Sequence, residues 1–307
     1  MLTASSNRLS GLLTWTLTLT FVLVVWGGVV RLSGSGLAIP DWPLAEGKLL
    51  PRAQHNVLIE YGHRFLAMLV GFSTLAIAIL VFRSSAARRG SLAGLTIAAL
   101  ITLAFQVFMG GRVVIEELPV DRVVTHLLLA FGFFGILLMM RLRVGEEIPA
   151  AAGSGPAPGD RPPSDPRARG LARFAHIAAG LVFLQAGLGA WVSSSGAALA
   201  CPDFPACQGT LTPKMEGLVG IHYAHRLGAY TVVLVVLGLL LAAAPARLPG
   251  RARWPLRFSG ILLATQFLLG VANVLGRVPL LVSAAHLGTA LVLFGALLIA
   301  AHELRRA

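Results

Sequence analysis

The chain has 307 residues, of which 56% are hydrophobic and only 12% are charged, and its formal net charge is +12. Because soluble domains carry roughly 25% charged residues, this composition excludes an ordinary soluble protein and predicts one that lies in a membrane. The positive charge does not indicate a nucleic-acid partner, since the basic residues form short clusters between apolar runs rather than a stripe among aromatic residues.

Eight apolar stretches are long enough to cross about 30 Å of hydrocarbon as helices. Strands are excluded because an open sheet would leave backbone groups unpaired in lipid. The first stretch has no small-residue cleavage site, so we expect a true span and not a removable signal peptide. The predicted fold is therefore an all-α integral membrane protein. Its predicted spans are 11–32, 56–82, 91–112, 122–142, 171–192, 217–243, 256–276 and 280–301.

The second half of the chain repeats the first at a nearly constant offset. The matching pairs are EYGHR at 60–64 and HYAHR at 222–226, PDWP at 40–43 and PDFP at 202–205, and His126 and His286. An internal duplication explains this register. We predict two four-helix-bundle repeats, 1–143 and 171–307, joined by a disordered cytoplasmic linker at 144–170 that is rich in Pro, Gly and charge. The even number of helices in each repeat makes the two halves parallel copies.

The basic residues also predict the orientation of the chain in the membrane. Most of them lie before the first span, after every second span and in the linker. The positive-inside rule then places both termini and the linker in the cytoplasm. The long loops 33–55 and 193–216 face outward, and all four repeated histidines lie near the outer ends of their helices.

These four histidines are His63 and His126 in the first half and His225 and His286 in the second. An ionisable side chain inside a span is costly and is by default a functional hypothesis, although a lone histidine serves equally well as a hydrogen-bonding group between helices. Two histidines on facing helices are what axial ligation of a haem iron requires. A zinc site is disfavoured because neither half offers a third or fourth ligand at suitable spacing. The sequence thus predicts two haem-type sites.

The halves differ one helical turn before the first histidine of each pair, where Glu60 is matched by His222. A carboxylate beside a haem edge can take a proton or stabilise a developing cation, so Glu60 marks the first half as the reactive one. The alternative is a solvated carboxylate at the membrane edge. Arg64 and Arg226 directly follow their histidines, and their partners are left open between a helix-packing salt bridge, haem propionates and a carbonyl-rich loop.

The second difference is the cysteine pair Cys201 and Cys207 in the outward loop of the second half. Five intervening residues on the oxidising side of a membrane favour a disulfide that staples this loop. A redox-active thiol pair is the alternative. The matching first-half positions are Ile39 and Ala45, so no such bridge can form there.

Together with GGVVRLSGSGL at 27–37, these motifs resemble the haem A synthase family, membrane enzymes that serve the assembly of haem-copper terminal oxidases. The resemblance covers essentially the whole chain apart from the linker. It implies an oxidoreductase that converts the C8 methyl of haem O into a formyl group by successive hydroxylations, giving haem A. It also implies roles by matching motif: His63, His126 and Arg64 hold the substrate haem, Glu60 assists the oxidation, and His225, His286 and Arg226 hold a haem b cofactor that passes electrons.

The resemblance also implies partners and a cellular location, and this chain departs from the family pattern in one place. Many members have a cysteine pair where this chain has Ile39 and Ala45, so a thiol role in that loop is in doubt here. The implied partners are haem O, membrane lipid, the haem O synthase (protohaem farnesyltransferase) and an electron-transfer partner, with no nucleic acid and with homo-oligomer formation left open. The expected location is the cell membrane of a bacterium or archaeon, with the haem sites toward the outer face.

Two other classes of function fit the sequence less well. A non-enzymatic two-haem electron carrier predicts ligands at both membrane faces, whereas the four histidines lie at one depth. A transporter made of parallel repeats predicts broken helices and polar residues near the midplane, and the spans that carry the histidines show no interruption. The enzyme is therefore the favoured reading.

Overall fold

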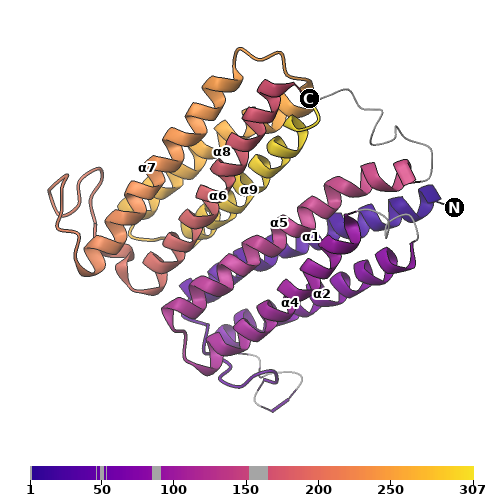
Figure 1. Cartoon of the computed structure of the whole chain (residues 1–307). Coiled ribbons are helices and arrows are strands. Elements are labelled where there is room, and N and C mark those ends of the chain that lie inside the picture. Colours follow the sequence, from indigo (N-terminus) through magenta and orange to yellow (C-terminus); the bar gives the residue numbers. More distant parts are fainter. Residues whose placement is uncertain (1, 46, 49–51, 53, 85–90, 152–164) are drawn as a thin grey trace. The chain divides into compact units, whose positions relative to one another are not determined.

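The computed structural model describes residues 2–45, 47–48, 52, 54–84, 91–151 and 165–307 (Figure 1). Within these ranges the regular structure is helical apart from two isolated bridges. Eight helices are long and apolar enough to cross a membrane, which confirms the predicted all-α fold and its spans. The elements are α1 (Leu2–Leu32), α2 (His55–Arg83), α4 (Leu92–Ile115), α5 (Val120–Ala151), α6 (Pro166–Ser194), the short 3-10 helix η1 (Ala197–Leu199), α7 (Gly217–Ala243), α8 (Gly250–Leu275) and α9 (Leu280–Leu304).

The helix boundaries follow local chemistry. Helix α6 begins with a proline in its first turn, and the carboxylate of Asp165 before it accepts a 2.9 Å hydrogen bond from the amide of Arg167. The turns before α5 and α9 are alike, because residues 117–118 and 277–278 all have positive φ and each pair precedes a proline. Residues other than glycine rarely adopt positive φ, so this shared backbone conformation at matching positions is a structural trace of the duplication.

The described structure divides into two compact units. The first comprises Met1–Glu117 and Leu129–Pro163, and the second comprises Leu118–Leu128 and Ser164–Ala307. The start of α5 is thus grouped with the second unit, and the predicted repeat boundaries at 143 and 171 stay a prediction. Much of the predicted linker, residues 152–164, lies outside the described residues.

In the first unit, α1, α2, α4 and α5 contribute to one core of buried apolar side chains. Each helix presents them at helical spacing, with members such as Leu13, Ile77, Leu92, Leu137 and Met140 essentially inaccessible. Because lipid tails are as apolar as these side chains, close packing rather than exclusion from water holds the helices together. Buried threonine hydroxyls in this unit donate to the carbonyl one turn earlier in their own helix, which satisfies them inside the core.

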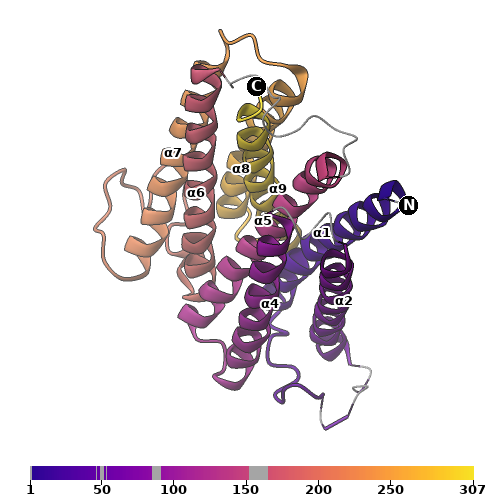
Figure 2. The same ribbon diagram turned by 45° about the vertical axis from the view of Figure 1, so that its right-hand side comes forward.

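In the second unit, α6 packs against α7 and α9, and α8 packs against the same two helices, so the four form a closed ring (Figures 1 and 2). Helix α9 is the most enclosed of the eight spanning helices. Its buried positions include many small residues, among them Ala284, Gly288, Gly295 and Ala300. Small side chains allow helix backbones to approach closely in a membrane.

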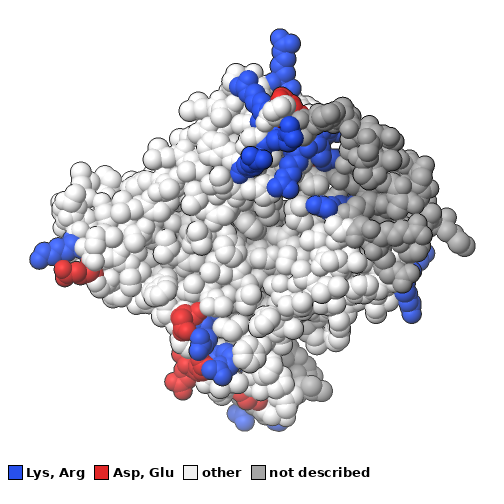
Figure 3. Space-filling model, in the orientation of Figure 1, with Lys and Arg blue, Asp and Glu red and all other residues white. Residues whose placement is uncertain are grey.

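Charge is unevenly distributed on the second unit. Lys and Arg side chains gather over the end where the C terminus lies (Figure 3). This end is formed by the start of α6, the α7–α8 turn and the end of α9. It is the end that the positive-inside rule places in the cytoplasm, and that orientation stays a prediction.

Candidate functional site

The second-half histidines lie on opposite helices of the ring. His225 lies on α7 and His286 on α9. Since each of these helices packs against both α6 and α8, α7 and α9 lie diagonally opposite one another. The structure therefore places this predicted pair on two diagonally opposite helices of the second unit.

Each of these rings packs against a glycine of a neighbouring helix. A Cβ atom on Gly189 of α6 would lie 3.0 Å from Cε1 of His225, and a Cβ atom on Gly270 of α8 would lie 3.3 Å from Cε1 of His286. Both separations are tighter than nine in ten real Cβ contacts. Any larger side chain would therefore press on the ring, so the glycines define the positions of the two imidazoles.

The polar surroundings of the two rings also fit a ligand between them. Nδ1 of His286 is buried and has no hydrogen-bond partner within the described residues, while Nε2 lies 3.3 Å from the amide nitrogen of Gln266. A buried polar atom without a partner costs free energy, which a bound group that engages the ring would offset. The described residues contain no cluster of three or more His, Cys, Asp or Glu able to hold a metal ion. Two axial imidazoles for a haem iron fit this donor set better than a cage of protein ligands.

The first half repeats one part of this arrangement. His63 of α2 packs against Gly27 of α1, where a Cβ atom would lie 3.0 Å from Cε1 of the ring, the same contact as between His225 and Gly189. His126 lies in the first turns of α5, in the segment grouped with the second unit, whereas His63 belongs to the first. The pairing of His63 with His126 stays a prediction.

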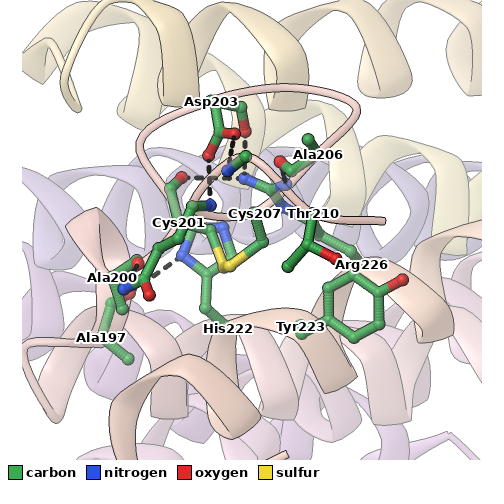
Figure 4. Close-up of a disulfide and its surroundings, with 12 residues drawn as sticks. Ala197, Ala200, Cys201, Asp203, Ala206, Cys207, Thr210, His222, Tyr223 and Arg226 are labelled. Atoms are coloured by element: carbon green, nitrogen blue, oxygen red, sulfur yellow. Dashed lines mark hydrogen bonds between the residues drawn. A yellow bond between two sulfur atoms is a disulfide. The ribbon is translucent and has the colours of Figure 1, made fainter. Parts of the chain in front are cut away.

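Each repeated arginine donates hydrogen bonds to three backbone carbonyls in the long loop that precedes its own helix. Arg64 donates to the carbonyls of Ile39, Asp41 and Leu44 at 2.8, 2.8 and 3.0 Å. Arg226 donates to the matching carbonyls of Cys201, Asp203 and Ala206 at 2.8, 2.8 and 2.7 Å (Figure 4). Of the partners left open by the sequence, a carbonyl-rich loop is thus observed in both halves.

We call Arg64 with residues 39–45 and 47–48 the first clasp, and Arg226 with residues 201–210 the second clasp. In both, an aspartate side chain braces the turn: Oδ2 of Asp41 accepts from the amide of Gly47, and Oδ2 of Asp203 accepts from the amide of Gly209, each at 2.8 Å. The aromatic-proline peptide bond is cis in both loops. The two loops therefore share one backbone design.

Glu60 is buried and contacts two members of the first clasp. It lies on α2, and only 3% of its surface is exposed. Oε1 accepts a 2.6 Å hydrogen bond from Nη2 of Arg64, and Oε2 accepts one of 2.8 Å from the amide of Ile39. The alternative of a solvated carboxylate at the membrane edge is therefore wrong. Its part in catalysis stays a prediction.

His222, which occupies the matching position in the second half, also contacts its loop. Its ring is buried, and Nδ1 lies 2.9 Å from the carbonyl oxygen of Ala197, so this nitrogen donates (Figure 4). A loop-holding role was not predicted for this residue. Glu60 and His222 thus hold equivalent loops with opposite hydrogen-bonding roles, one as an acceptor and the other as a donor.

The predicted disulfide is present. Cys201 and Cys207 are bonded to each other, and both residues are fully buried within the second clasp (Figure 4). Thiol–disulfide exchange needs access to a sulfur atom, so this burial favours the structural staple over the redox-active pair. In the first clasp, Ile39 and Ala45 occupy the matching positions and pack with Val57 in a small buried apolar cluster.

Comparison with known proteins identifies the family of this chain. A family model described as cytochrome oxidase assembly protein matches residues 10–298. The chain belongs to this family. Among its curated relatives, the "Heme A synthase" of Symbiobacterium thermophilum is 33% identical, with 86% of this chain and 85% of the relative covered. Those of Nitrosospira multiformis and Shewanella oneidensis are 29% and 28% identical, covering 94% and 93% of this chain and 91% and 93% of the relatives.

Sequence reasoning missed the details of two contacts. A salt bridge of Arg64 was left open, but its acidic partner, Glu60, was not identified, although their spacing of four residues on one helix could have signalled it. The second joins Gln185 to His225, whose amide nitrogen and Nδ1 are 2.9 Å apart. These residues lie on different helices, so no local pattern in the sequence pointed to the second contact.

Proposed function

We propose that this protein is a haem A synthase, which oxidises the C8 methyl of haem O to a formyl group by successive hydroxylations and so supplies haem A for terminal oxidases. The observation that carries the proposal is the diagonal pair His225 and His286, each ring set against a glycine. It occurs in a duplicated membrane chain of the cytochrome oxidase assembly protein family, whose similar curated relatives are named "Heme A synthase".

The two halves divide the work. His225 and His286 hold a haem b cofactor, and His63 and His126 hold the substrate haem. When bound, the cofactor haem would supply a one-electron redox centre that passes electrons. The protein contributes the axial imidazoles, the glycine spaces beside the rings, and the clasps that close the loops at that end of each half.

Glu60 is the residue we place at the reaction. Burial keeps its carboxylate away from bulk water, and its position one turn before His63 puts it on the same helix face. A methyl group that becomes a formyl group loses protons, and a positioned carboxylate can accept one. Arg64, which pairs with Glu60 and grips the loop, contributes to the substrate-haem site by fixing both in place.

The setting of the reaction is also proposed. The chain lies in the cell membrane of a prokaryote with both termini in the cytoplasm and both haem sites toward the outer face, as the basic residues indicate. Haem O is the substrate, the haem O synthase is the source of it, and an electron-transfer partner exchanges electrons with the cofactor haem. The rival reading as a two-haem electron carrier leaves Glu60 with a loop-holding role alone.

The decisive experiment is a pyridine-haemochrome spectrum, with chromatography of the pigment extracted from purified protein made in cells with and without a haem O supply. We expect haem b alone without the supply, and haem b joined by haem O and formyl-bearing haem A with it. Two haem b per chain under both conditions, with no formyl product, would overturn the enzyme proposal in favour of an electron carrier.

A further inference from the structure

One hydrogen bond between α8 and α9 has no part in the proposal so far. The hydroxyl of Ser283 donates to Oδ1 of Asn273 at 2.7 Å, and both residues are partly buried. Asn273 lies in the last turn of α8, which ends at Leu275, and Ser283 lies in the first turn of α9. Because this contact engages the amide oxygen, the amide nitrogen of Asn273 points away from Ser283 and keeps its hydrogens for another acceptor.

The Asn273–Ser283 pair lies about one helical turn from the residues that surround the ring of His286. Ser283 precedes His286 by three residues, so both lie on one face of α9. On α8, Asn273 follows Gly270, which packs against the ring, by three residues. It follows Gln266, whose amide nitrogen is 3.3 Å from Nε2 of the ring, by seven residues, which is nearly two full turns. Gln266 and Asn273 therefore lie in one row along α8, with Asn273 nearer the end of the helix.

Neither member of the pair occurs in the first half. At the offset that matches His286 with His126, the matching residues are Asn273 and Val113, Ser283 and Val123, and, in the turn between the helices, Arg277 and Glu117. The second half thus offers hydrogen-bonding groups and a positive charge where the first half has apolar side chains and a negative charge. This difference favours an anionic group at this end of the second half.

We propose that Asn273, oriented by Ser283, binds a propionate carboxylate of the haem held by His225 and His286. This inference rests on the haem ligation proposed above. Haem b carries its propionates on one edge of the ring, and a carboxylate can only accept hydrogen bonds, so the amide nitrogen of Asn273 is a complementary partner. Charged carboxylates are costly in hydrocarbon, which directs this edge of the haem toward the ends of the helices, where the pair lies.

The consequence is an anchor for the haem that does not act through its iron. A hydrogen bond to a charged acceptor is roughly twice as strong as one between neutral groups, so this contact slows the loss of a cofactor that must stay in place. In the first half, the side chains of Val113 and Val123 offer no such bond to a haem that must leave as product. Asn273 thus contributes to the difference between the resident haem and the exchanging one.

The test measures the binding of haem b and of its dimethyl ester, in which the propionates cannot ionise, by optical titration of full-length protein made in haem-starved cells. Every protein compared carries His63→Ala, so that the titration reports the second-half site. Asn273→Asp is the sharpest variant, because its carboxylate still accepts from Ser283 but repels a propionate instead of donating to it. It should weaken binding of haem b by about 10–100-fold, the worth of a hydrogen bond to a charged group, and change binding of the ester far less.

Two further variants complete the comparison. Asn273→Val, which copies the first half, should also lose affinity for haem b more than for the ester. Thr265→Val is the control, because it removes an exposed hydroxyl of the same helix that donates to the carbonyl of Ile261, and it should bind both compounds normally. If the pair only joins α8 to α9, Asn273→Asp will bind haem b normally and Asn273→Val will lose both compounds equally. Either result overturns the proposal, and Asn273→Asp decides alone if Asn273→Val fails to fold.

His286→Ala in the same background separates this inference from the proposal beneath it. If that variant binds haem b with unchanged affinity and an unchanged spectrum, the proposed ligation itself is wrong. If it loses haem b while Asn273→Asp binds both compounds as the unaltered site does, the ligation stands and only the propionate contact is wrong.

Discussion

The first and second clasps have the same backbone arrangement but are closed by different means. In both, an arginine grips three carbonyls and an aspartate accepts from a glycine amide. The second clasp is closed by the disulfide between Cys201 and Cys207, and the first by the apolar contact of Ile39 and Ala45. The comparison shows that the arginine and aspartate contacts accompany this loop shape with or without a covalent bridge.

The closures suit the tasks proposed for the halves. The loop of the half proposed to hold the cofactor has a covalent staple. The loop of the half proposed to hold the substrate is held by hydrogen bonds, apolar packing and the carboxylate of Glu60. Non-covalent contacts can open and re-form while substrate enters and product leaves. We infer that the first clasp is the one that opens.

The largest expected effect is the loss of formyl formation when Glu60, which is matched by His222 in the second half, is replaced. Glu60→Ala should keep haem bound but abolish formyl formation, while His222→Ala at the matching position should leave the oxidation running. Extraction of pigment and chromatography measure both. Full activity in Glu60→Ala would remove Glu60 from the reaction.

Glu60→Gln refines this result. The amide side chain keeps an oxygen for the amide of Ile39, which Oε2 of Glu60 now engages at 2.8 Å, but it is a far weaker proton acceptor. Because Gln cannot also accept from Arg64, loss of formyl formation assigns Glu60 to proton transfer only if exchange at the amide of Gly47 in the first clasp is unchanged. Activity that is retained in Glu60→Gln but lost in Glu60→Ala would assign Glu60 to holding the loop.

The next largest effect should be a difference in how far the two clasps open when their arginines are removed. Hydrogen bonds from charged donors contribute about 1.5–3 kcal/mol each, so Arg64→Ala and Arg226→Ala both weaken their loops. The first clasp should open further because no disulfide limits it. Hydrogen–deuterium exchange at Gly47 and Gly209, whose amides bond to aspartate, reports the two loops separately.

Two variants control that comparison. Arg64→Lys should resemble Arg64→Ala, because a single ammonium cannot reproduce a planar fork that reaches several carbonyls. Arg251→Ala removes an exposed ion pair with Glu303, between α8 and α9 and outside both clasps, and should leave both exchange rates unchanged. Equal opening of the two loops would show that the disulfide adds nothing to closure.

A smaller effect is expected from the bridge itself. Replacing Cys201 and Cys207 by alanine should lower the free energy of unfolding by about 2 kcal/mol on a loop-entropy estimate for so short a ring. The second loop should keep its shape, since Arg226 still grips it, and formyl formation should continue. Thermal unfolding and pigment extraction measure the two. Loss of formyl formation in folded protein would instead support a redox role for the thiols.

The repeat offers the reciprocal experiment. Ile39→Cys with Ala45→Cys should form a bridge in the first clasp, because these residues match the natural pair in a loop held by the same arginine and aspartate contacts. If the first clasp must open for haem exchange, the bridged variant should release product more slowly until it is reduced. Unchanged turnover in the oxidised variant would contradict the opening of this loop.

The sequence alone was sufficient for features that depend on composition or on repetition along the chain. The eight spans followed from apolar length, and the disulfide from two cysteines in one outward loop. The grip of Arg64 and Arg226 was left among alternatives, because its acceptors are backbone carbonyls, which every residue has. The contact of Gln185 with His225 depends on how α6 is rotated against α7, and residue identities alone do not specify that rotation.

The smallest expected effect is faster amide exchange in the second clasp in acid, where the carboxylate of Asp203 accepts hydrogen bonds from two amides. The pKa of Asp203 lies below its usual value, first because the amide of Gly209 donates to the carboxylate and further because the amide of Gln208 does so. A carboxylate with a lowered folded pKa stabilises the fold fully above its unfolded pKa, about 3.9, and that contribution is lost as pH falls through the folded value. Exchange at Gly209, corrected for its intrinsic rate, should therefore accelerate below about pH 4.

Asp203→Asn removes the titrating group while keeping an oxygen for the two amides. Its second loop should be less protected than that of the unaltered protein near neutral pH, because a neutral acceptor forms weaker hydrogen bonds than a carboxylate. It should then show no further loss in acid, so that the two proteins converge. Because the disulfide and Arg226 still close the loop, convergence should leave it folded. An equal acid response in both proteins would locate the titrating group elsewhere than at Asp203.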